Sequence, residues 1–348
     1  MIHATDLFRP HDDPDDHWDL ACVYALAYEG RIDLKAVLCD FPRSGRRNDP
    51  DVAAVAQMNY LTGQAVPLIV GTSKPMRSRA DVQKDVPEAD RNGVRLVLRV
   101  LRESSRPVVI NITGSCRTIA VAGKRAPSLF AEKCAAIYLN AGTGSRDPVK
   151  ARRREYNVSL DSKSYAAIFD LPCPVYWMPC FEEFGQQQPN GGWPVRPFGT
   201  YYRFRHSDVL PHLSDRVVNF FTFMSRGGRP GKSSAHSTGW LRHLVGPRDR
   251  EEETRISSTF RNMWCTGGFL HATGRTVCRD GRIVSLDQAG DEAVFTFDPV
   301  RVSCRDDGVT HWNPTTEPTN RFIFHVRDTI AYPRAMTTAL RTLLARLP

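Results

Sequence analysis

The chain has 348 residues, of which 41% are hydrophobic and 24% are charged. This composition argues against a disordered chain and predicts one domain over residues 1–348. The formal charge of +9 does not indicate a nucleic-acid partner, because the basic residues are spread out and no nucleic-acid motif accompanies them. We interpret them as a solvated basic surface.

Strand and helix signals alternate over a core of residues 1–180, which predicts an α/β fold with a mostly parallel open sheet and helices on both faces. We expect strands over 2–7, 34–39, 66–70 and 107–112, and helices over 15–29, 52–61 and 94–102. The alternation continues through 119–122, 135–139, 164–169 and 175–178.

A long segment rich in Gly, Pro, Gln and aromatic residues follows, from 181 to about 215. A loop of this length in a compact domain predicts a functional insertion or a disordered segment. The remaining part, 216–348, is expected to hold C-terminal helices and a late β-ribbon. We expect helices over 217–224, 261–271 and 329–347, and the ribbon over 294–302 and 321–326.

No apolar run is long enough for a membrane span, and the first residues do not resemble a signal peptide. We therefore expect a cytoplasmic protein without a membrane partner. Nine cysteines are scattered along the chain without a Cys-x-x-Cys pair. This pattern predicts reduced, mostly buried thiols.

Six aspartates lie within fourteen residues, where the first strand meets the first helix: Asp6, Asp12, Asp13, Asp15, Asp16 and Asp19. Open parallel sheets bind ligands at the carboxyl ends of their strands. Clustered carboxylates without nearby cysteine suit Ca²⁺ better than zinc. One or two of these aspartates are explained as helix caps, but six are not.

Several short segments stand out by their order and spacing. They are Thr5-Asp6 with Asp15-Asp16, Val66 to Pro75, Val108 to Ala122 with Thr113-Gly114, Ile137 to Gly142, and Arg154-Glu155-Tyr156-Asn157. Together they resemble the inosine-uridine preferring nucleoside hydrolase family. Thr5-Asp6 and Asp15-Asp16 resemble its opening motif, although Asp13-Pro14 and Asp19 fit the spacing almost as well.

The resemblance implies hydrolysis of an N-glycosidic bond in a ribonucleoside or related ribosyl compound by a Ca²⁺-bound water. Asp6 is then the base that takes the water's proton. The implied metal ligands are Asp6, Asp15, Asp16, Asp19 and the carbonyl of Thr113. The implied substrate-binding residues are Glu155, Asn157, Asn140 and Trp264. We expect a homodimer or homotetramer.

Two departures favour an alternative, a ligand-binding relative that has lost the chemistry. Cys265 stands where the family has a metal-binding carboxylate, and a thiol is a poor calcium ligand. The loop after the second strand reads Cys39-Asp40-Phe41-Pro42-Arg43, with Asn48 the nearest substitute for a ribose-contacting asparagine. A hydrolase of a different ribosyl compound, with the 181–211 segment reshaping its pocket, is a third interpretation.

Histidines and aromatic residues add further candidates. His271 is a candidate general acid for the leaving base, against the alternative of a core histidine. His11 and His17 either join the acidic pocket or are inert neighbours of aspartates. An aromatic set either stacks on a base or packs a loop; its members are Trp193, Tyr201, Tyr202 and Phe204.

Overall fold

The computed structural model describes residues 1–7, 14–42, 51–183, 187–189, 191–227 and 239–348. Five residues named above, His11, Asp12, Asp13, Arg43 and Asn48, lie outside these ranges. In the described part, no helix is both long enough and apolar enough to cross a membrane. All nine cysteines are free and buried, as the sequence predicts.

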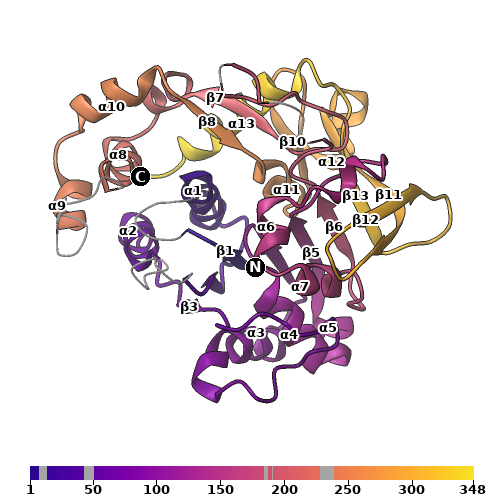
Figure 1. The fold of residues 1–348 in the computed structure, drawn as a ribbon. Coiled ribbons are helices and arrows are strands. Elements are labelled where there is room, and N and C mark those ends of the chain that lie inside the picture. The colour runs from indigo at the N-terminus through magenta and orange to yellow at the C-terminus, as the bar shows by residue number, and fades with distance from the viewer. Residues whose placement is uncertain (8–13, 43–50, 184–186, 190, 228–238) are drawn as a thin grey trace.

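A nine-stranded sheet forms the centre of the molecule (Figure 1). Its strands, in spatial order, are β12 (Thr310–Pro314), β11 (Phe295–Cys304), β13 (Arg321–Val326), β6 (Val175–Met178), β5 (Cys134–Asn140), β4 (Val108–Ile112), β1 (Ile2–Thr5), β2 (Ala36–Cys39) and β3 (Leu68–Val70). The seven strands that lie between β13 and β3 in this spatial order, both included, pair in parallel. Strand β11 is antiparallel to both β13 and β12. The predicted parallel sheet is therefore confirmed, and its late ribbon continues the same sheet.

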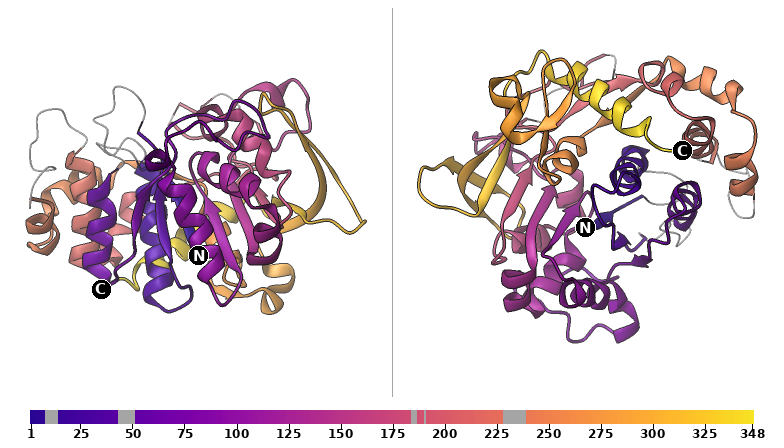
Figure 2. Two further views of the ribbon diagram at one scale, coloured as in Figure 1. Left: turned by 90° about the horizontal axis from the view of Figure 1, so that it is seen from below. Right: turned by 180° about the vertical axis from the view of Figure 1, so that it is seen from behind.

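Helices cover both faces of the sheet (Figure 2). One layer contains α1 (Pro14–Tyr28), α2 (Val52–Thr62), α8 (Asp215–Gly227), α11 (Thr266–His271) and α13 (Tyr332–Leu344). The other contains α3 (Asn92–Glu103), α4 (Arg117–Arg125), α5 (Pro127–Lys133) and α7 (Ser162–Ile168). Alternate strand residues face opposite layers: Val37 packs in the first core and Leu38 in the second.

The remaining elements are short. The helices are α6 (Tyr156–Leu160), α9 (Gly239–Val245), α10 (Arg250–Ser257) and α12 (Leu286–Ala289). Two antiparallel pairs complete the strands: β9 (Arg275–Val277) with β10 (Ile283–Ser285), and β7 (Tyr202–Arg205) with β8 (Phe260–Met263).

The predicted helix over 261–271 is wrong in its first part. Residues 260–263 form β8, which pairs with β7 from inside the predicted loop insertion, and the helix begins only at Thr266. Tyr202 and Phe204 of β7 are buried in the core. Pairing between segments almost sixty residues apart overrides the local helical pattern, which cannot report a distant partner.

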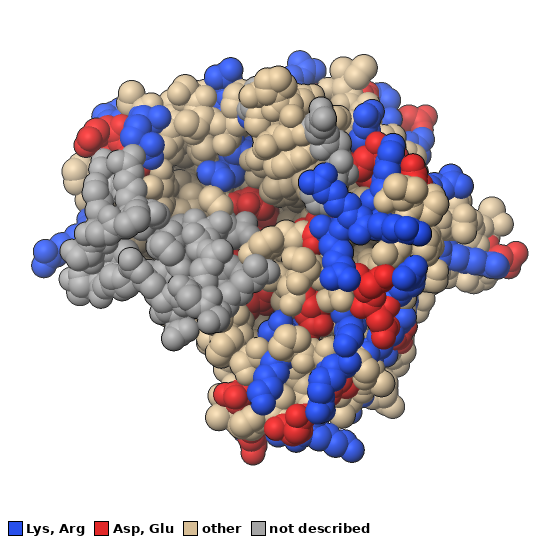
Figure 3. Space-filling view, in the orientation of Figure 1, with Lys and Arg blue, Asp and Glu red and all other residues tan. Residues whose placement is uncertain are grey.

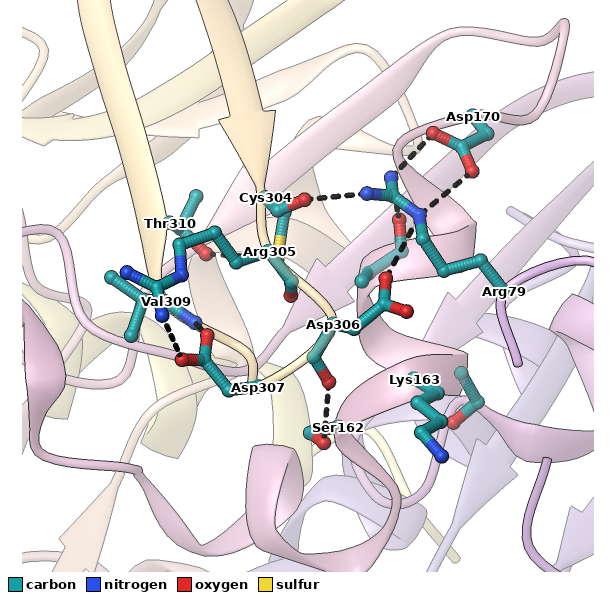
Figure 4. A network of polar contacts seen from close by, with 12 residues as sticks. Arg79, Ser162, Lys163, Asp170, Cys304, Arg305, Asp306, Asp307, Val309 and Thr310 are labelled. Carbon is teal, nitrogen blue, oxygen red and sulfur yellow. Dashed lines mark hydrogen bonds and ion pairs between the residues drawn. The ribbon is translucent and has the colours of Figure 1, made fainter. Parts of the chain in front are cut away.

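Arg79, in the loop between β3 and α3, joins three segments that are distant in the sequence (Figure 4). Its guanidinium donates to the carbonyl oxygens of Cys304 at 2.6 Å and Ala166 at 3.1 Å, and forms an ion pair with Asp170 at 2.5 Å. Asp306 lies 3.7 Å from Arg79 Nε. The loop after β3 is thereby fastened to the end of α7 and to the turn between β11 and β12.

Candidate functional site

The acidic residues near the N-terminus are placed by the junction of β1 and α1. Asp6 follows the last residue of β1, and Asp15 and Asp16 lie in the first turn of α1. Pro14 begins the helix, a position where its missing N–H costs nothing, and negative side chains are favoured at a helix N-terminus. Asp19 lies three residues after Asp16 and therefore on the same helical face.

Two threonines hold Asp16 in place. The hydroxyls of Thr5, at the end of β1, and Thr113, at the end of β4, both donate to Asp16 Oδ1. The carbonyl oxygen of Thr113 accepts from Asn157 Nδ2 at 2.8 Å. The structure thus brings together Asp16, Thr113 and Asn157 at the carboxyl edge of the sheet, from three distant segments of the chain.

The carboxylates of Asp6, Asp16 and Asp19 are buried and repel one another. Burial and then the charge of Asp15 raise the pKa of Asp16 to about 7, against the opposing hydrogen bonds of the two threonines. Burial, followed by the charge of Asp16, raises the pKa of both Asp6 and Asp19 well above the usual range. Neither oxygen of Asp6 or of Asp19 has a hydrogen-bond partner in the described part of the chain.

A cavity of about 480 Å³ opens above this cluster. Asp15 and Asp16, with Thr113 beside them, form its acidic side, whereas Asp6 and Asp19 are buried and do not line it. In the space-filling view, Lys and Arg side chains gather beside a hollow that has acidic side chains inside it (Figure 3). The volume is in the range of small-molecule sites.

Aromatic side chains form another wall of the cavity. Phe181, Trp193 and Trp264 line it, with ring centroids of Phe181 and Trp264 5.8 Å apart. The indole Nε1 of Trp264 is buried without a hydrogen-bond partner among the described residues. Tyr201 packs behind this wall, 5.5 Å from the Trp193 ring. The wall presents a stacking surface, and the indole N–H of Trp264 is left unsatisfied within it by the described residues.

Cys265 is part of the cavity lining, beside the acidic cluster. Its thiol donates to Asn140 Oδ1 at 3.2 Å, and the thiol of Cys180 donates to the same oxygen at 3.5 Å. Burial and the charge of Asp19 raise the pKa of Cys265 well above its ordinary value. Cys265 is therefore a neutral thiol near the place where the family resemblance implies a carboxylate.

Glu155 and Asn157 are positioned by the start of α6. The carboxylate of Glu155 caps this helix and accepts from the backbone N–H groups of Asn157 at 2.9 Å and of Gly142 at 2.9 Å. The amide of Asn157 donates to Thr113 and, at 3.0 Å, to the carbonyl of Asn140. Both side chains line the cavity.

Two histidines considered above lie apart from the cavity lining. His271 Nδ1 is 2.7 Å from the hydroxyl of Tyr138, within a cluster of aromatic rings, and burial lowers the pKa of His271 to about 4. The Nε2 atom of His17 is 2.8 Å from Asp51 Oδ2. The position of His271 matches the alternative of a core histidine. His17 is buried beside Asp51 and does not line the cavity.

No group of three or more His, Cys, Asp or Glu side chains in the described ranges is arranged to hold a metal ion. The carboxylate oxygens of Asp6 and Asp19 nevertheless fit a cation, because none of these four buried acceptor atoms has a hydrogen bond of ordinary geometry among the described residues, and Asp19 has only the Cys265 thiol nearby. The acidic cluster therefore has the charge and the oxygen atoms of a cation site, without a preformed cage.

Several residues at the site were not predicted from the sequence. Asp40, which follows β2, accepts from the backbone N–H of Ser115 at 2.6 Å and lies close to Asp6 across Gly114. A Cβ at Gly114 would lie 2.8 Å from Asp6 Oδ1 and 2.9 Å from Asp40 Oδ2, so only glycine leaves both carboxylates room. The position of Asp40 directly after a parallel strand is the sequence feature that could have predicted its place at the site. Arg153, Arg154, Cys180 and Phe181 also line the cavity.

No family model and no curated protein sequence matches the chain. Solved structures do. The purine-preferring ribonucleoside hydrolase from Gardnerella vaginalis has a TM-score of 0.58 and 12% identity, over 99% of this chain and 98% of that chain. A plant nucleoside hydrolase has a TM-score of 0.56 and 15% identity, over 99% and 98%. The type III effector protein XopQ, complexed with adenosine diphosphate ribose, has a TM-score of 0.51 and 13% identity, over 99% and 93%. The chain has a nucleoside-hydrolase-like fold.

Proposed function

We propose that this protein hydrolyses the N-glycosidic bond of a ribonucleoside or a related ribosyl compound. The observation that carries the proposal is that Asp16, Thr113 and Asn157 meet at the carboxyl edge of the sheet, beside a cavity with an aromatic wall. The nucleoside hydrolases that share the fold support it, and so does the adenosine diphosphate ribose bound to XopQ.

Different residues of the cavity bind the ribose, bind the base and stabilise the charge that develops in the reaction. Asn157 and Glu155 bind the ribose hydroxyls, with Asn140 holding the wall behind them. The aromatic wall stacks on the base, and the free indole N–H of Trp264 donates a hydrogen bond to it. The carboxylates of Asp15 and Asp16 stabilise the positive charge that develops on the ribosyl ring.

Asp6 takes the proton of the attacking water. A general base works best when its pKa lies near the working pH, and burial together with the charges of Asp16 and Asp40 raises the pKa of Asp6. Asp6 lies next to Asp16, on the buried side of the cluster. His271 has no part in this scheme, because it is bonded to Tyr138 within a cluster of aromatic rings and does not contact the acidic cluster.

Ca²⁺ is the cation that we propose for the acidic cluster. Its ligands are drawn from Asp6, Asp15, Asp16, Asp19 and the carbonyl of Thr113. When bound, the ion polarises the attacking water and the ribose hydroxyls. The unpartnered oxygens of Asp6 and Asp19 favour a cation, and calcium tolerates the irregular coordination that such a cluster offers.

A second candidate is a ribosyl-binding protein without hydrolytic activity. The neutral thiol of Cys265 favours it, because this thiol adds no negative charge where the resemblance implies a carboxylate. In that case the cavity and its aromatic wall still bind the ligand.

The two functions are separated by incubating the purified protein with a panel of nucleosides, with Ca²⁺ or with chelator, and measuring both ribose release and ligand binding. The hydrolase releases ribose from at least one nucleoside, and chelator abolishes the release. Asp16→Asn should lower the rate on the order of 100-fold or more. Asp287→Asn, an exposed carboxylate on α12, is the matched control and should not. Binding without release supports the second candidate, and absence of both contradicts a ribosyl site.

A further inference from the structure

Two consecutive arginines, Arg153 and Arg154, line the same cavity as the acidic cluster. Resting on the proposed function, we infer that the ligand of this cavity is an anionic ribosyl compound that carries a phosphate group on its ribose. The guanidinium groups of Arg153 and Arg154 bind that phosphate at the rim, while Asn157 and the acidic side hold the sugar.

The charge of Arg154 is not neutralised by the carboxylate that follows it in the chain. Both oxygens of Glu155 accept backbone N–H groups, from Asn157 on one side and from Gly142 on the other, and its side chain is buried. Arg154 is exposed, and no acidic partner contacts it in the described part of the chain. A neighbouring cation differs, because Lys150 pairs with Glu183 at 2.7 Å. The guanidinium group of Arg154 is therefore available to bind a ligand in the cavity.

The two sides of the cavity carry opposite charge. An acidic side alone would repel a phosphorylated ligand, whereas a wholly neutral nucleoside gives the guanidinium of Arg154 nothing to bind. A ribosyl phosphate satisfies both sides, since its hydroxyls meet carboxylate and amide groups and its anionic end meets the arginines. Arginine matches phosphate because its planar fork forms two parallel hydrogen bonds.

Chain spacing keeps the two subsites close. Arg154 is three residues from Asn157, and the intervening Glu155 is fixed by its backbone hydrogen bonds at the start of α6. The distance between the sugar-binding amide and the arginines is thereby set by a short, anchored segment. A phosphate attached directly to the ribose fits this spacing better than one at the far end of a base.

The test compares the affinities of AMP and adenosine by calorimetry, in an Asp6→Asn background so that neither ligand is consumed. AMP should bind at least about tenfold more tightly than adenosine, the equivalent of about 1.4 kcal/mol. Arg154→Gln should remove most of this preference, and Arg153→Gln together with Arg154→Gln should remove all of it. Added salt should weaken the preference, because rim charges are screened.

Arg152→Gln is the matched control. Arg152 belongs to the same basic run and is exposed, but it does not line the cavity, so its variant should keep the preference for AMP. Equal affinities for AMP and adenosine would overturn this inference and leave the proposed function standing. A preference for AMP that survives the double substitution would overturn it as well. If neither ligand binds, here or to the unmodified protein, the proposed function fails too.

Discussion

Two clusters of charged side chains hold distant segments of this chain together, and they are built in opposite ways. In the acidic cluster of Asp6, Asp15, Asp16 and Asp19, like charges are gathered in the interior. In the network around Arg79, opposite charges meet near the surface, and the guanidinium is matched by two carbonyl oxygens and a carboxylate (Figure 4). Among the described residues, the oxygens of Asp6 and Asp19 in the first cluster have no hydrogen-bond partner, whereas the donors of Arg79 in the second are satisfied.

The difference distinguishes a cluster that suits a ligand from one that only stabilises the fold. Burying like charges without donors costs free energy, which a folded protein tolerates where another molecule supplies the missing charge. The Arg79 network needs no such molecule, because its partners all belong to the chain. We therefore expect the acidic cluster to make the protein respond to pH and cations. The Arg79 network should contribute to the free energy of unfolding without such a response.

The largest expected effect concerns the protonation of Asp16. Its pKa is raised to about 7 in the folded protein, so between the unfolded pKa near 4 and this value only the folded state holds the proton. Asp16 therefore contributes stability that is fully present at acid pH and is lost as the pH rises toward 7. In chelator, the stability of wild type relative to Asp16→Asn should fall by about 1 kcal/mol per pH unit in this window.

Thermal melts of the two proteins from pH 4 to pH 8 measure this difference, and saturating Ca²⁺ should flatten it. A difference that does not vary with pH would mean that Asp16 stays ionised and that the cluster is not strained.

A smaller effect is expected from Arg79→Ala. The substitution removes the donors to Cys304 and Ala166 and the ion pair with Asp170, so the free energy of unfolding should fall by about 1–3 kcal/mol. Denaturant titration measures the loss. Arg77→Ala is the control, because Arg77 pairs with Asp81 and Asp85 at the surface and its removal should leave stability nearly unchanged. If both variants lose the same free energy of unfolding, the Arg79 network does not stabilise the fold more than a surface ion pair does.

The smallest effect is expected from Cys265→Asp, which adds one more negative charge beside Asp19. Without metal the variant should melt below wild type, and it should bind Ca²⁺ roughly tenfold more tightly, or about 1.4 kcal/mol. Calorimetric titration with Ca²⁺ measures the affinity. Cys265→Ser keeps the size of the side chain without the charge and should behave like wild type. An unchanged affinity in Cys265→Asp would place Cys265 outside the cation site.

The sequence predicts the parallel part of the fold because strand and helix signals there are local. The helix expected over 15–29 is α1, and the strand expected over 175–178 is β6. The error at 260–263 has the opposite cause, since β8 exists only through its pairing with β7. Pairing between distant segments leaves little trace in either segment alone.

The candidate site shows the same division. The order of the motifs predicts that Asp16, Thr113 and Asn157 meet, because all three follow or flank the ends of parallel strands. Cys180 and Arg154 were not predicted, since their approach to the cavity depends on how the loops after β5 and β6 fold back. From the sequence we interpret the basic residues as a solvated surface, whereas the structure shows that two of them, Arg153 and Arg154, line the cavity.

The position of β13 bears on how the chain folds as it is synthesised. Residues 321–326 insert between β6 and β11, pairing in parallel with a strand made about 145 residues earlier. Arg321 then donates to the carbonyl oxygens of Phe169 at 2.7 Å and Cys173 at 2.9 Å, which secures the start of the inserted strand. Until that insertion, a nascent chain exposes the open edge of β6, and such unpaired edges promote association between chains. Ribosomal pausing before residue 321 should therefore favour chaperone capture and aggregation.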